Sequence, residues 1–380
     1  MSSPLAEANM QDNVQAKESL IPPEAPNLEN DMDICDGRLW SCEVWWRDRQ
    51  QWLEERGYML RPRYRPGWKP SWAGTKKWWF WCEDGVSPRY YNLLDATRIA
   101  DGKVVMLKRF LRSDHPYEAE IGQFFSSEPL ASDPRNHCVP IYDTLQDPYD
   151  SGTVILVMPL LRLHHDPPPT TVGEVVEALR QIFEGMHFMH EHRVAHRDCM
   201  VMNTMMESVM FPNLWHPQDL HYNRKCTASP KHYTRTERPP KYYIIDFGLS
   251  RRYDVNDPSP RELPIIGGDK TVPEYQGAGY WIASDPFATD VYYLGHMIQQ
   301  YYLNIFIGLE FLDTLVTDMT QADPSKRPTM GEIVAQFEQI CSKCTIPMFR
   351  GRLHGKKESP MFRRMLDIRH AFVSMGYRIR

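Results

Sequence analysis

The sequence predicts an α+β fold in which strands precede the main helices. Residues 92–100 alternate weakly in polarity and residues 104–108 form an apolar run, with an Asp-Gly pair between them that is typical of a hairpin turn. A third strand-like run covers residues 153–158. The clearest helix follows at residues 171–191, where apolar side chains recur at helical spacing.

This helix carries clear signals for its start and for its buried face. Thr171 is expected to cap it, and Glu174, three residues later, completes the pattern of a capping box. The apolar residues at helical spacing are Val172, Val175, Val176, Leu179, Ile182, Phe183 and Met186. A group of histidines follows at His187, His190, His192 and His196. No carboxylate–histidine zinc motif surrounds these histidines, so structural roles are the preferred interpretation.

Composition argues against several classes of protein. A chain of 380 residues is long enough for one large two-lobed core or two domains. The formal net charge of −5 shows no basic bias, which argues against nucleic acid as the main partner. No apolar run approaches the roughly 20 residues of a membrane span, and the polar N-terminus lacks a secretory h-region. We therefore expect an intracellular protein, in the cytoplasm, the nucleus or both. The lone C-x-x-C at Cys341 and Cys344 does not predict a zinc site.

Two segments of unusual composition precede the strands. Residues 1–36 are acidic, contain four prolines and lack aromatic residues, which predicts a disordered head. Residues 37–89 then hold nine of the eleven tryptophans. Within this segment, residues 43–56 are expected to form a helix ending at Gly57, and residues 58–72 are expected to be irregular. The side of the helix with the large apolar residues comprises Val44, Trp45, Trp52 and Leu53.

The tryptophan-rich segment has two interpretations. Alternating tryptophan and arginine could form a nucleic-acid surface through stacking on bases. The preferred interpretation is an N-terminal extension that packs on the strand-rich part of the fold, with its tryptophans buried in the contact.

Two motifs in the second half of the chain carry the chemistry. Residues 196–203 read H-R-D, four residues and Asn, and residues 246–248 read D-F-G at the end of a strand-like run. In this order they resemble the catalytic loop and the metal-binding motif of the eukaryotic protein kinases. The resemblance implies a bilobal protein-kinase-like fold, with a small β-rich lobe and a large helical lobe. It also implies ATP and Mg²⁺ as cofactors.

The resemblance assigns roles to the residues of these motifs. Asp198 would orient and deprotonate the hydroxyl nucleophile, while Asn203 and Asp246 would hold Mg²⁺ against the nucleotide phosphates. His196 and Arg197 complete the catalytic loop. An arginine before the catalytic aspartate further suggests control by phosphorylation of the segment after D-F-G. The candidate acceptors in that segment are Ser250, Tyr253, Ser259 and Thr271.

Residues upstream match the nucleotide-binding part of the same family. Lys108 corresponds to the lysine that contacts the nucleotide phosphates. A carboxylate from the next helix would hold this lysine, and the family's E-x-x-I spacing selects Glu118, with Glu120 as the alternative.

The run at residues 153–158 resembles the strand that leads into the kinase hinge, which is expected at residues 159–162. Met158 then takes the gatekeeper position. Pro159 lacks an N–H, which is tolerable where a carbonyl faces the adenine, whereas the N–H of Leu161 must remain available. Because three prolines follow the hinge, the helix that usually comes next is expected to be vestigial.

Later motifs extend the resemblance toward residue 340. V-P-E ends at Glu274, D-V-x-x-x-G begins at Asp290, and D-P-x-x-R-P-T contains Arg327. In the family, this glutamate and this arginine form a buried ion pair, whose loss would cost several kcal/mol.

The motifs define a domain organisation. The kinase-like domain is expected at residues 90–345, after the extension at 37–89. An ordered insert at residues 207–240 interrupts it, because the aromatic residues there favour a packed excursion over a free linker. A basic tail follows at residues 346–380, for which a solvated state is preferred over docking on the acidic head.

Two parts of the family pattern are missing. No glycine-rich loop precedes the hairpin, although such a loop lets backbone N–H groups approach the phosphates. Met200 and Met202 stand where kinases place a lysine or an arginine, and a thioether cannot replace that charge. Lys241 or a residue of the insert is a candidate substitute. These departures resemble those of lineage-specific fungal protein-kinase-like proteins, which keep a similar L-L-D-A-T-R-I segment and a tryptophan-rich N-terminal part.

Three functions compete. The preferred function is that of a protein kinase of the serine/threonine type, which acts on a protein substrate. We expect it to be a monomer. The alternative is a pseudokinase, a nucleotide-binding or scaffolding module with a regulatory protein partner, which the missing glycine loop and Met200 favour. A small-molecule kinase ranks last, because D-F-G, V-P-E and D-P-x-x-R-P-T belong to the protein-kinase side.

Overall fold

The computed structural model describes residues 37–265 and 268–377, which divide into two compact units. The first unit contains the described residues up to Val104 together with Trp215–Pro230. The second contains Val105–Leu214 and the described residues from Lys231 onward. The acidic head predicted at residues 1–36 lies outside the described residues. Strands and helices are both present, so the predicted mixed α+β class is confirmed, and the elements are compatible with a kinase-like fold.

The first unit begins with two short helices, α3 (Ser41–Arg47) and α4 (Gln50–Glu55). The prediction of one continuous helix over residues 43–56 is wrong, because the helix ends at Arg47 and a new one begins at Gln50. The break changes which side chains face inward, so Trp46 and Leu53 are fully buried whereas Trp45 and Trp52 are only half-buried. Gly57 follows α4 with a φ of +89°, as expected for a helix-ending glycine.

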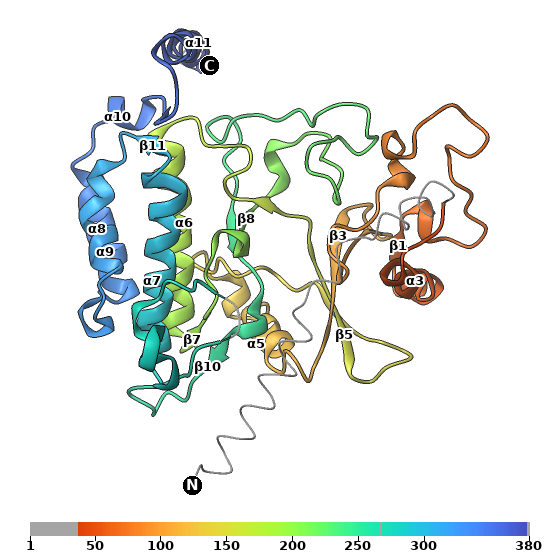
Figure 1. The fold of residues 1–380 in the computed structure, drawn as a ribbon, viewed down its shortest axis with the longest axis horizontal. Coiled ribbons are helices and arrows are strands. Elements are labelled where there is room, and N and C mark those ends of the chain that lie inside the picture. The colour runs from red at the N-terminus through yellow and green to blue at the C-terminus, as the bar shows by residue number, and fades with distance from the viewer. Residues whose placement is uncertain (1–36, 266–267, 378–380) are drawn as a thin grey trace. The chain divides into compact units, whose positions relative to one another are not determined.

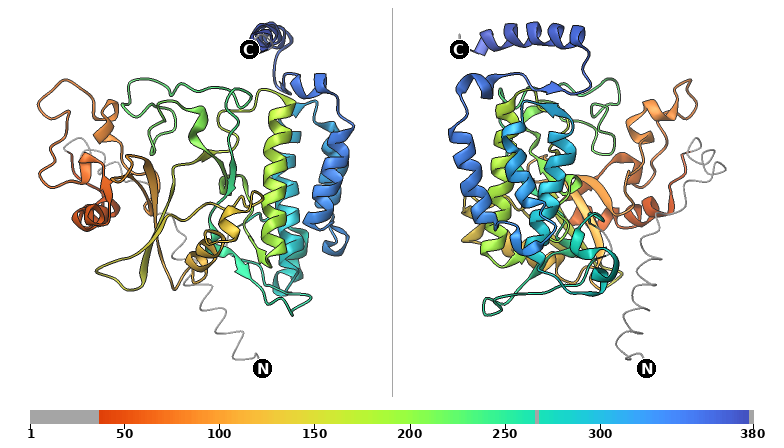
Figure 2. Two further views of the ribbon diagram at one scale, coloured as in Figure 1. Left: turned by 180° about the vertical axis from the view of Figure 1, so that it is seen from behind. Right: turned by 60° about the vertical axis from the view of Figure 1, so that its left-hand side comes forward.

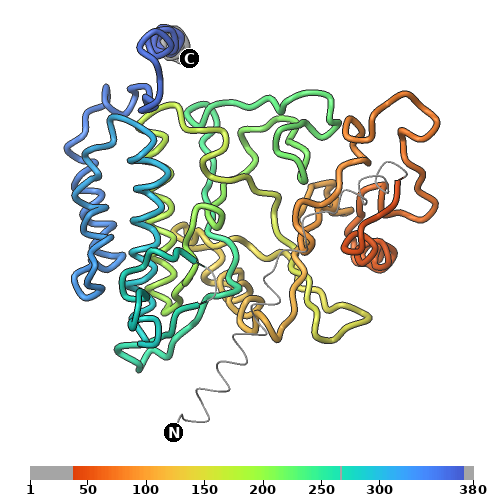
Figure 3. Tube along the Cα trace, in the orientation of Figure 1, coloured from red at the N-terminus to blue at the C-terminus, as the bar shows by residue number. Residues whose placement is uncertain are grey.

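After Gly57 the chain forms strand β1 (Tyr58–Leu60), which pairs antiparallel with β2 (Leu93–Arg98). The predicted irregular segment therefore starts with a strand. Between β1 and β2 the chain makes a long excursion with three short 3₁₀ turns, visible as the orange trace in Figure 3. These turns are η1 (Pro62–Tyr64), η2 (Trp79–Trp81) and η3 (Glu83–Gly85).

Buried polar groups hold this excursion in place. Arg63 donates from Nε and Nη2 to the two carboxylate oxygens of Glu43 on α3, at 2.6 and 2.9 Å, and both side chains are fully buried. The Asp84 carboxylate accepts hydrogen bonds from Ser71 and from the indole of Trp68. Most tryptophans of the segment are not fully buried. Trp46 and Trp72 are buried, whereas Trp78 and Trp81 are more than half exposed.

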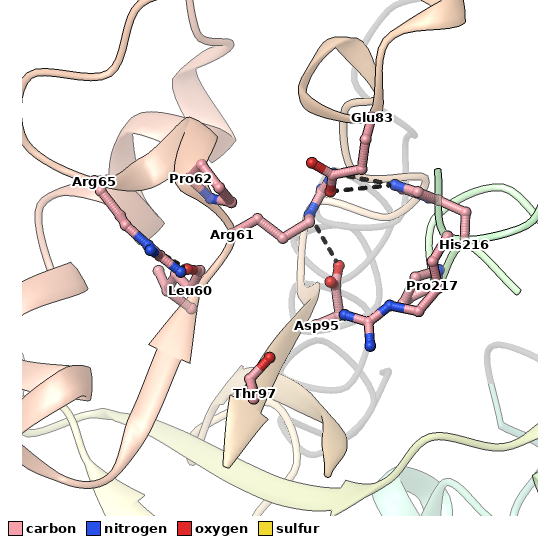
Figure 4. Close-up of a pocket in the computed structure, with 10 residues that line it drawn as sticks. Leu60, Arg61, Pro62, Arg65, Glu83, Asp95, Thr97, His216 and Pro217 are labelled. Carbon is pink, nitrogen blue, oxygen red and sulfur yellow. Dashed lines mark hydrogen bonds and ion pairs between the residues drawn. The ribbon is translucent and has the colours of Figure 1, made fainter. Parts of the chain in front are cut away.

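The segment Trp215–Pro230 of the predicted insert belongs to the first unit because polar contacts attach it there. Figure 4 shows Arg61 between Asp95 and Glu83, with His216 directed at Glu83. Gln218 donates to Asp95 at 2.9 Å. Arg61, Glu83, Asp95 and His216 line a cavity of about 180 Å³ at the end of β1. The insert is ordered here, as the aromatic residues predicted.

The second unit contains strands β3 (Val104–Leu111), β4 (Asp143–Gln146) and β5 (Thr153–Pro159), with helix α5 (Glu118–Phe125) between β3 and β4 in sequence. β5 pairs antiparallel with both β3 and β4, and Lys108 lies opposite Leu156. A buried cluster joins the sheet to α5. Its members are Phe110, Val154, Leu156 and Ala119. This packing determines where α5 presents its first turn to β3.

Helices α6, α7, α8 and α9 of the second unit lie side by side in Figures 1 and 2. α6 packs against α9, and α7 packs against α8. Their bounds are α6 (Val172–Glu191), α7 (Pro286–Ile298), α8 (Asp313–Met319) and α9 (Met330–Ser342), followed by α10 (Ile346–Arg350) and α11 (Pro360–Tyr377). None of the helices in the described residues is both long enough and apolar enough to span a membrane.

α6 confirms its predicted buried face, since every apolar residue named for it is buried. Thr171 caps the helix by accepting the N–H of Glu174 at 3.1 Å. The predicted capping box is wrong, because the Glu174 carboxylate bonds Thr170 and Thr236 and does not return to Thr171. The Thr236 contact attaches part of the insert to this helix.

Short strands complete the second unit. β6 (Arg162–Leu163), β8 (Thr204–Met206) and β9 (Tyr242–Ile244) form one sheet; β7 (Val194–Ala195) pairs with β10 (Arg251–Arg252), and β11 (Phe306–Ile307) pairs with β12 (His354–Gly355). No helix lies between β5 and α6, all of which is described, so the vestigial helix after the hinge is reduced to nothing.

The predicted basic tail at residues 346–380 is structured over the part described. It contains α10, β12 and α11, and Arg352 joins Glu358 and Asp367 through its guanidinium. Many side chains of α11 are exposed, and the preference for a solvated tail over docking on the acidic head stays a prediction.

The predicted ion pair between Glu274 and Arg327 is confirmed. The guanidinium contacts both carboxylate oxygens, at 2.7 and 2.6 Å, and the two side chains are almost fully buried. Arg327 also donates to the carbonyls of Gln321 and Ala288, and Thr289 donates to Glu274. The pair thus connects the segment before α7 with the turn before α9.

We expect Glu274→Gln to lower the free energy of unfolding by about 3–5 kcal/mol, because it leaves the Arg327 charge buried without a counter-charge. Denaturant unfolding measures this. Glu338→Gln is the matched control, since its pair with Arg180 is half exposed and its loss should cost less than about 1 kcal/mol. Equal effects of the two variants would contradict the prediction.

Candidate active site

Lys108 on β3 lies at the centre of a charged cluster within the second unit. Its ammonium bonds Glu118, the first residue of α5, and donates to Oδ1 of Asp246 at 2.8 Å. The structure therefore brings together three of the predicted residues. Of the two candidate glutamates, Glu118 is the partner, whereas Glu120 is exposed on the other side of α5.

The electrostatics of the cluster keep Lys108 charged. Burial acts to lower the pKa of the Lys108 ammonium, but the charges of Glu118 and Asp246 outweigh it and raise that pKa above its usual value. Burial likewise acts to raise the pKa of Asp246, yet Lys108 and the N–H of Gly248 lower it to about 2. A cation and a carboxylate are thus both present at neutral pH.

The backbone around Asp246 is strained and tightly packed. Asp246 has a φ of 68°, in the left-handed region that non-glycine residues rarely adopt. Gly248 is required two residues later, because a Cβ there would lie 2.8 Å from Nδ1 of His115 and 3.2 Å from Oε2 of Glu118. The buried ring of Phe247 lies beside those of His196 and Phe125. Close packing therefore determines the direction of the Asp246 carboxylate.

The loop after β7 is positioned by Asp290 of α7. Its fully buried carboxylate accepts the N–H of His196 at 2.7 Å and that of Arg197 at 2.6 Å. The Nε2 of His190 also contacts it, at 3.0 Å. His196 in turn donates from Nε2 to the carbonyl of Ile245, next to Asp246. These bonds connect the two motifs that the sequence placed fifty residues apart.

Asp198 and Asn203 form the other half of the site. The side-chain amide of Asn203 donates to both the carbonyl and Oδ2 of Asp198, at 2.8 and 2.9 Å. Oδ1 of Asp198 is buried and accepts no hydrogen bond of good geometry from a described residue, although the backbone N–H of Gly268 lies close enough to lower the pKa of this carboxyl. Burial, with a smaller contribution from the charge of Asp246, raises the pKa of Asp198 above its usual value. An orphaned, basic carboxylate oxygen is suited to accepting a proton.

The expected hinge connects β5 to β6 through two buried leucines, Leu160 and Leu161. Met158 packs against the buried cluster between the sheet and α5, and Pro159 is the last residue of β5. The N–H of Leu161 makes no hydrogen bond to any described residue. It therefore remains available as a donor, as adenine recognition would require.

The residues present also fit a divalent cation. Hard oxygen ligands suit Mg²⁺. Oδ1 of Asp246 is engaged by Lys108 and Gly248, but Oδ2 accepts no hydrogen bond from a described residue. Because Asn203 directs its NH₂ group at Asp198, its amide oxygen is also left without a described partner. The fit thus consists of one carboxylate oxygen and one amide oxygen. Within the described ranges, no group of three or more His, Cys, Asp and Glu side chains forms a further metal site.

Lys241, the named candidate for a replacement cation, has its described contacts at other residues. It lies over the ring of Tyr243 and close enough to His137 to act on the pKa of that histidine. Met200 and Met202 stand two and four residues after Asp198, and Met202 is exposed.

Comparison with known proteins gives partial support to a kinase relationship. No model of a known protein family matches the chain. A protein named "Light-sensor Protein kinase" from Ceratodon purpureus is 25% identical over 216 residues, which is 47% of this chain and 14% of that protein. The chain is thus similar in part to a protein kinase. The chain spans about one seventh of the length of that protein, and the resemblance to fungal proteins stays a prediction.

Two residues of the site were missed by sequence reasoning. Asp290 was recognised as part of D-V-x-x-x-G but not as the anchor of the catalytic loop, although a lone acidic residue at the start of an apolar helix is a signal for such a role. His115 contacts the carbonyl of Gly248 at 3.1 Å, and nothing in its sequence surroundings indicates this.

We expect Lys108→Met to lower the free energy of unfolding by about 3–5 kcal/mol at pH 7, because Glu118 and Asp246 lose their shared cation. Burial raises the pKa of Glu118, so its unpaired charge destabilises the variant above that pKa and is removed by protonation as the pH falls. The loss should therefore shrink between pH 7 and about pH 4.5, measured by denaturant unfolding.

Lys103→Met is the matched control, because Lys103 is largely exposed and only 3.8 Å from Asp101. Its effect should stay below about 1 kcal/mol at both pH values. A pH-independent loss in Lys108→Met would show that packing of the lysine stem, and not the charge cluster, is responsible.

Proposed function

We propose that this protein is a protein kinase that transfers the γ-phosphate of ATP to a protein hydroxyl, of the serine/threonine type. The observation that carries the proposal is the pairing of Lys108 with Glu118 and Asp246 in the same compact unit as Asp198 and Asn203. The partial similarity to the Ceratodon purpureus protein kinase supports it. In this proposal the fold is the bilobal kinase fold, and the substrate is another protein.

Each residue has a role in the proposed reaction. Lys108 supplies a positive charge for the nucleotide phosphates, and Glu118 keeps its ammonium in one direction. Asp246 and Asn203 would hold Mg²⁺, which neutralises phosphate charge when bound. Oδ1 of Asp198 orients the substrate hydroxyl and accepts its proton as the new O–P bond forms. Pro159, Leu161 and Met158 would border the adenine.

The orientation of Asp198 follows from its neighbours. Asn203 fixes Oδ2, so Oδ1 is the oxygen left for the hydroxyl. Asp290, acting through the N–H groups of His196 and Arg197, is a positioning residue that holds the loop. Catalysis of this kind depends mainly on positioning and electrostatics, because the transferring phosphoryl group needs little covalent help.

A pseudokinase is the second candidate, and two observations favour it. The excursion between β1 and β2 stands where a glycine-rich loop is expected, and it is held by side chains such as Arg63. Met200 supplies no charge for the transferring phosphate, and Lys241 points elsewhere. A pseudokinase would keep the nucleotide site as a structural element and act through a regulatory partner.

We expect Asp198→Asn to reduce phosphate transfer by about 10²–10⁴-fold, because the amide cannot accept the hydroxyl proton. The measurement is transfer of labelled γ-phosphate from Mg·ATP to a generic protein substrate and to the protein itself. Transfer by the parent should also fall as the pH is lowered through the raised pKa of Asp198, since only the carboxylate is active.

Asp313→Asn, on the exposed start of α8, is the control and should transfer phosphate at the parental rate. Equal transfer by the parent and by Asp198→Asn would exclude the proposed role. No transfer by either, with a thermal shift still produced by ATP, would favour the pseudokinase.

A further inference from the structure

Arg197 makes a set of contacts that the catalytic loop alone does not require. Its side chain is 8% exposed, and its backbone has a φ of 67°. The guanidinium contacts the carboxylate of Glu262 at 3.2 Å and donates to the carbonyls of Leu249 and Leu263, both at 3.3 Å. One arginine therefore joins the beginning of the segment after D-F-G to residues 262–263, late in the same segment.

Glu262 is held so that its carboxylate meets this guanidinium. Its backbone N–H and carbonyl both pair with Ser284, each at 2.9 Å, just before α7. Oε2 contacts Arg197, and Oε1 accepts the hydroxyl of Tyr253 at 3.2 Å. Both carboxylate oxygens are thus in use, and both backbone groups are paired. With its backbone and its side chain both held, Glu262 provides a negative charge at a fixed position.

Burial explains why Arg197 needs such a counter-charge. A guanidinium this far from water is costly unless an acidic group accompanies it. Asp290 does not supply the charge, because it bonds the N–H of Arg197 and not its side chain. Glu262 is the carboxylate that contacts the guanidinium among the described residues. In segments controlled by phosphorylation, an added phosphate provides this charge.

The four predicted phosphate acceptors fit this role poorly. Ser250 is fully buried and donates to the carbonyl of His196. Tyr253 donates its hydroxyl to Glu262, so a phosphate there would remove that bond and place like charges together. Thr271 donates to Asp269. Ser259 is exposed, but none of its hydrogen bonds reaches Arg197. Ser250, one of the predicted candidates, is therefore not accessible to phosphorylation in this arrangement.

We propose that Glu262 is a positioning residue that takes the place of a regulatory phosphate. It holds residues 249–263 against Arg197, so that the site works without phosphorylation of the segment after D-F-G. Because Arg197 directly precedes Asp198, a shift of its side chain is passed to the backbone of the proposed base. The regulatory part of this inference rests on the proposed kinase function, whereas the structural link between Arg197 and Glu262 does not.

The test compares Glu262→Gln, Glu262→Asp and the parent, all as the full chain and treated with a phosphatase until intact mass shows no phosphate. The first readout is amide hydrogen exchange over residues 249–263, which needs no activity. Glu262→Gln should increase exchange there at least severalfold, and Glu262→Asp should restore part of the protection, because it keeps the charge. Glu338→Gln is the matched control and should leave exchange in this segment unchanged.

The second readout is phosphate transfer. The dephosphorylated parent should keep its full rate, while Glu262→Gln should lose about tenfold or more in kcat with little change in KM for ATP, and Glu262→Asp should recover part of the loss. A parent that loses activity on dephosphorylation overturns the proposal, as does a parental kcat in Glu262→Gln. Parental hydrogen exchange in Glu262→Gln overturns the structural link itself.

These outcomes separate the two proposals. If the parent transfers no phosphate at all, the proposed function fails, and the exchange data alone then decide the link. Increased exchange in Glu262→Gln with partial recovery in Glu262→Asp would uphold the link in a protein without kinase activity. Unchanged exchange would reject it whatever the activity of the parent.

Discussion

The arrangement of the candidate site depends on one buried carboxylate, that of Asp290. It is fully inaccessible to water and accepts hydrogen bonds from two successive backbone N–H groups and a histidine ring. A buried carboxylate is stable only when such donors surround it. The hydrogen bonds from the catalytic loop to Asp290 therefore hold the loop and α7 together. The left-handed backbone of Arg197, which would otherwise relax, is maintained by this contact.

From this anchor the rest of the site follows in short steps. His196 donates a hydrogen bond to the carbonyl of Ile245 and so fixes the position of the D-F-G turn. In this turn Asp246 also adopts a left-handed backbone conformation. Lys108 on β3 contacts Asp246, and Glu118 on α5 contacts the ammonium of Lys108. Three strained or charged elements therefore stabilise one another. This mutual dependence explains how a chain without a glycine-rich loop can still bring the polar groups of the candidate site together.

The first unit shows a different use of buried charge. Arg63 with Glu43, and Arg61 with Asp95, hold a long segment rich in aromatic residues without regular secondary structure. Such pairs contribute less to net stability than an apolar core of the same volume would, but they fix direction because their geometry is narrow. The exposed Trp78 and Trp81 indicate that the tryptophans do not act simply as a buried core.

How much could be predicted from the sequence varied with the physical origin of each feature. Periodicity predicted the helix α6 and the strands around residues 92–108, because it acts locally. The order of motifs, which matches a known spacing, predicted the pair of Lys108 with Glu118. The sequence did not indicate the break between α3 and α4, because neither Asp48 nor Arg49, which separate them, is a strong helix breaker such as glycine or proline.

Contacts made by distant residues outside the motifs were decided by the tertiary structure alone. Glu262 meets Arg197 across 65 positions, and Gln218 meets Asp95 across 123, and no motif includes Glu262 or Gln218. A carboxylate in an exposed, polar stretch looks the same in sequence whether it is solvated or paired. The sequence by itself thus determined which groups could perform phosphoryl chemistry. Only folding decided which of them are brought within hydrogen-bonding distance, because that depends on burial and backbone direction rather than on residue type.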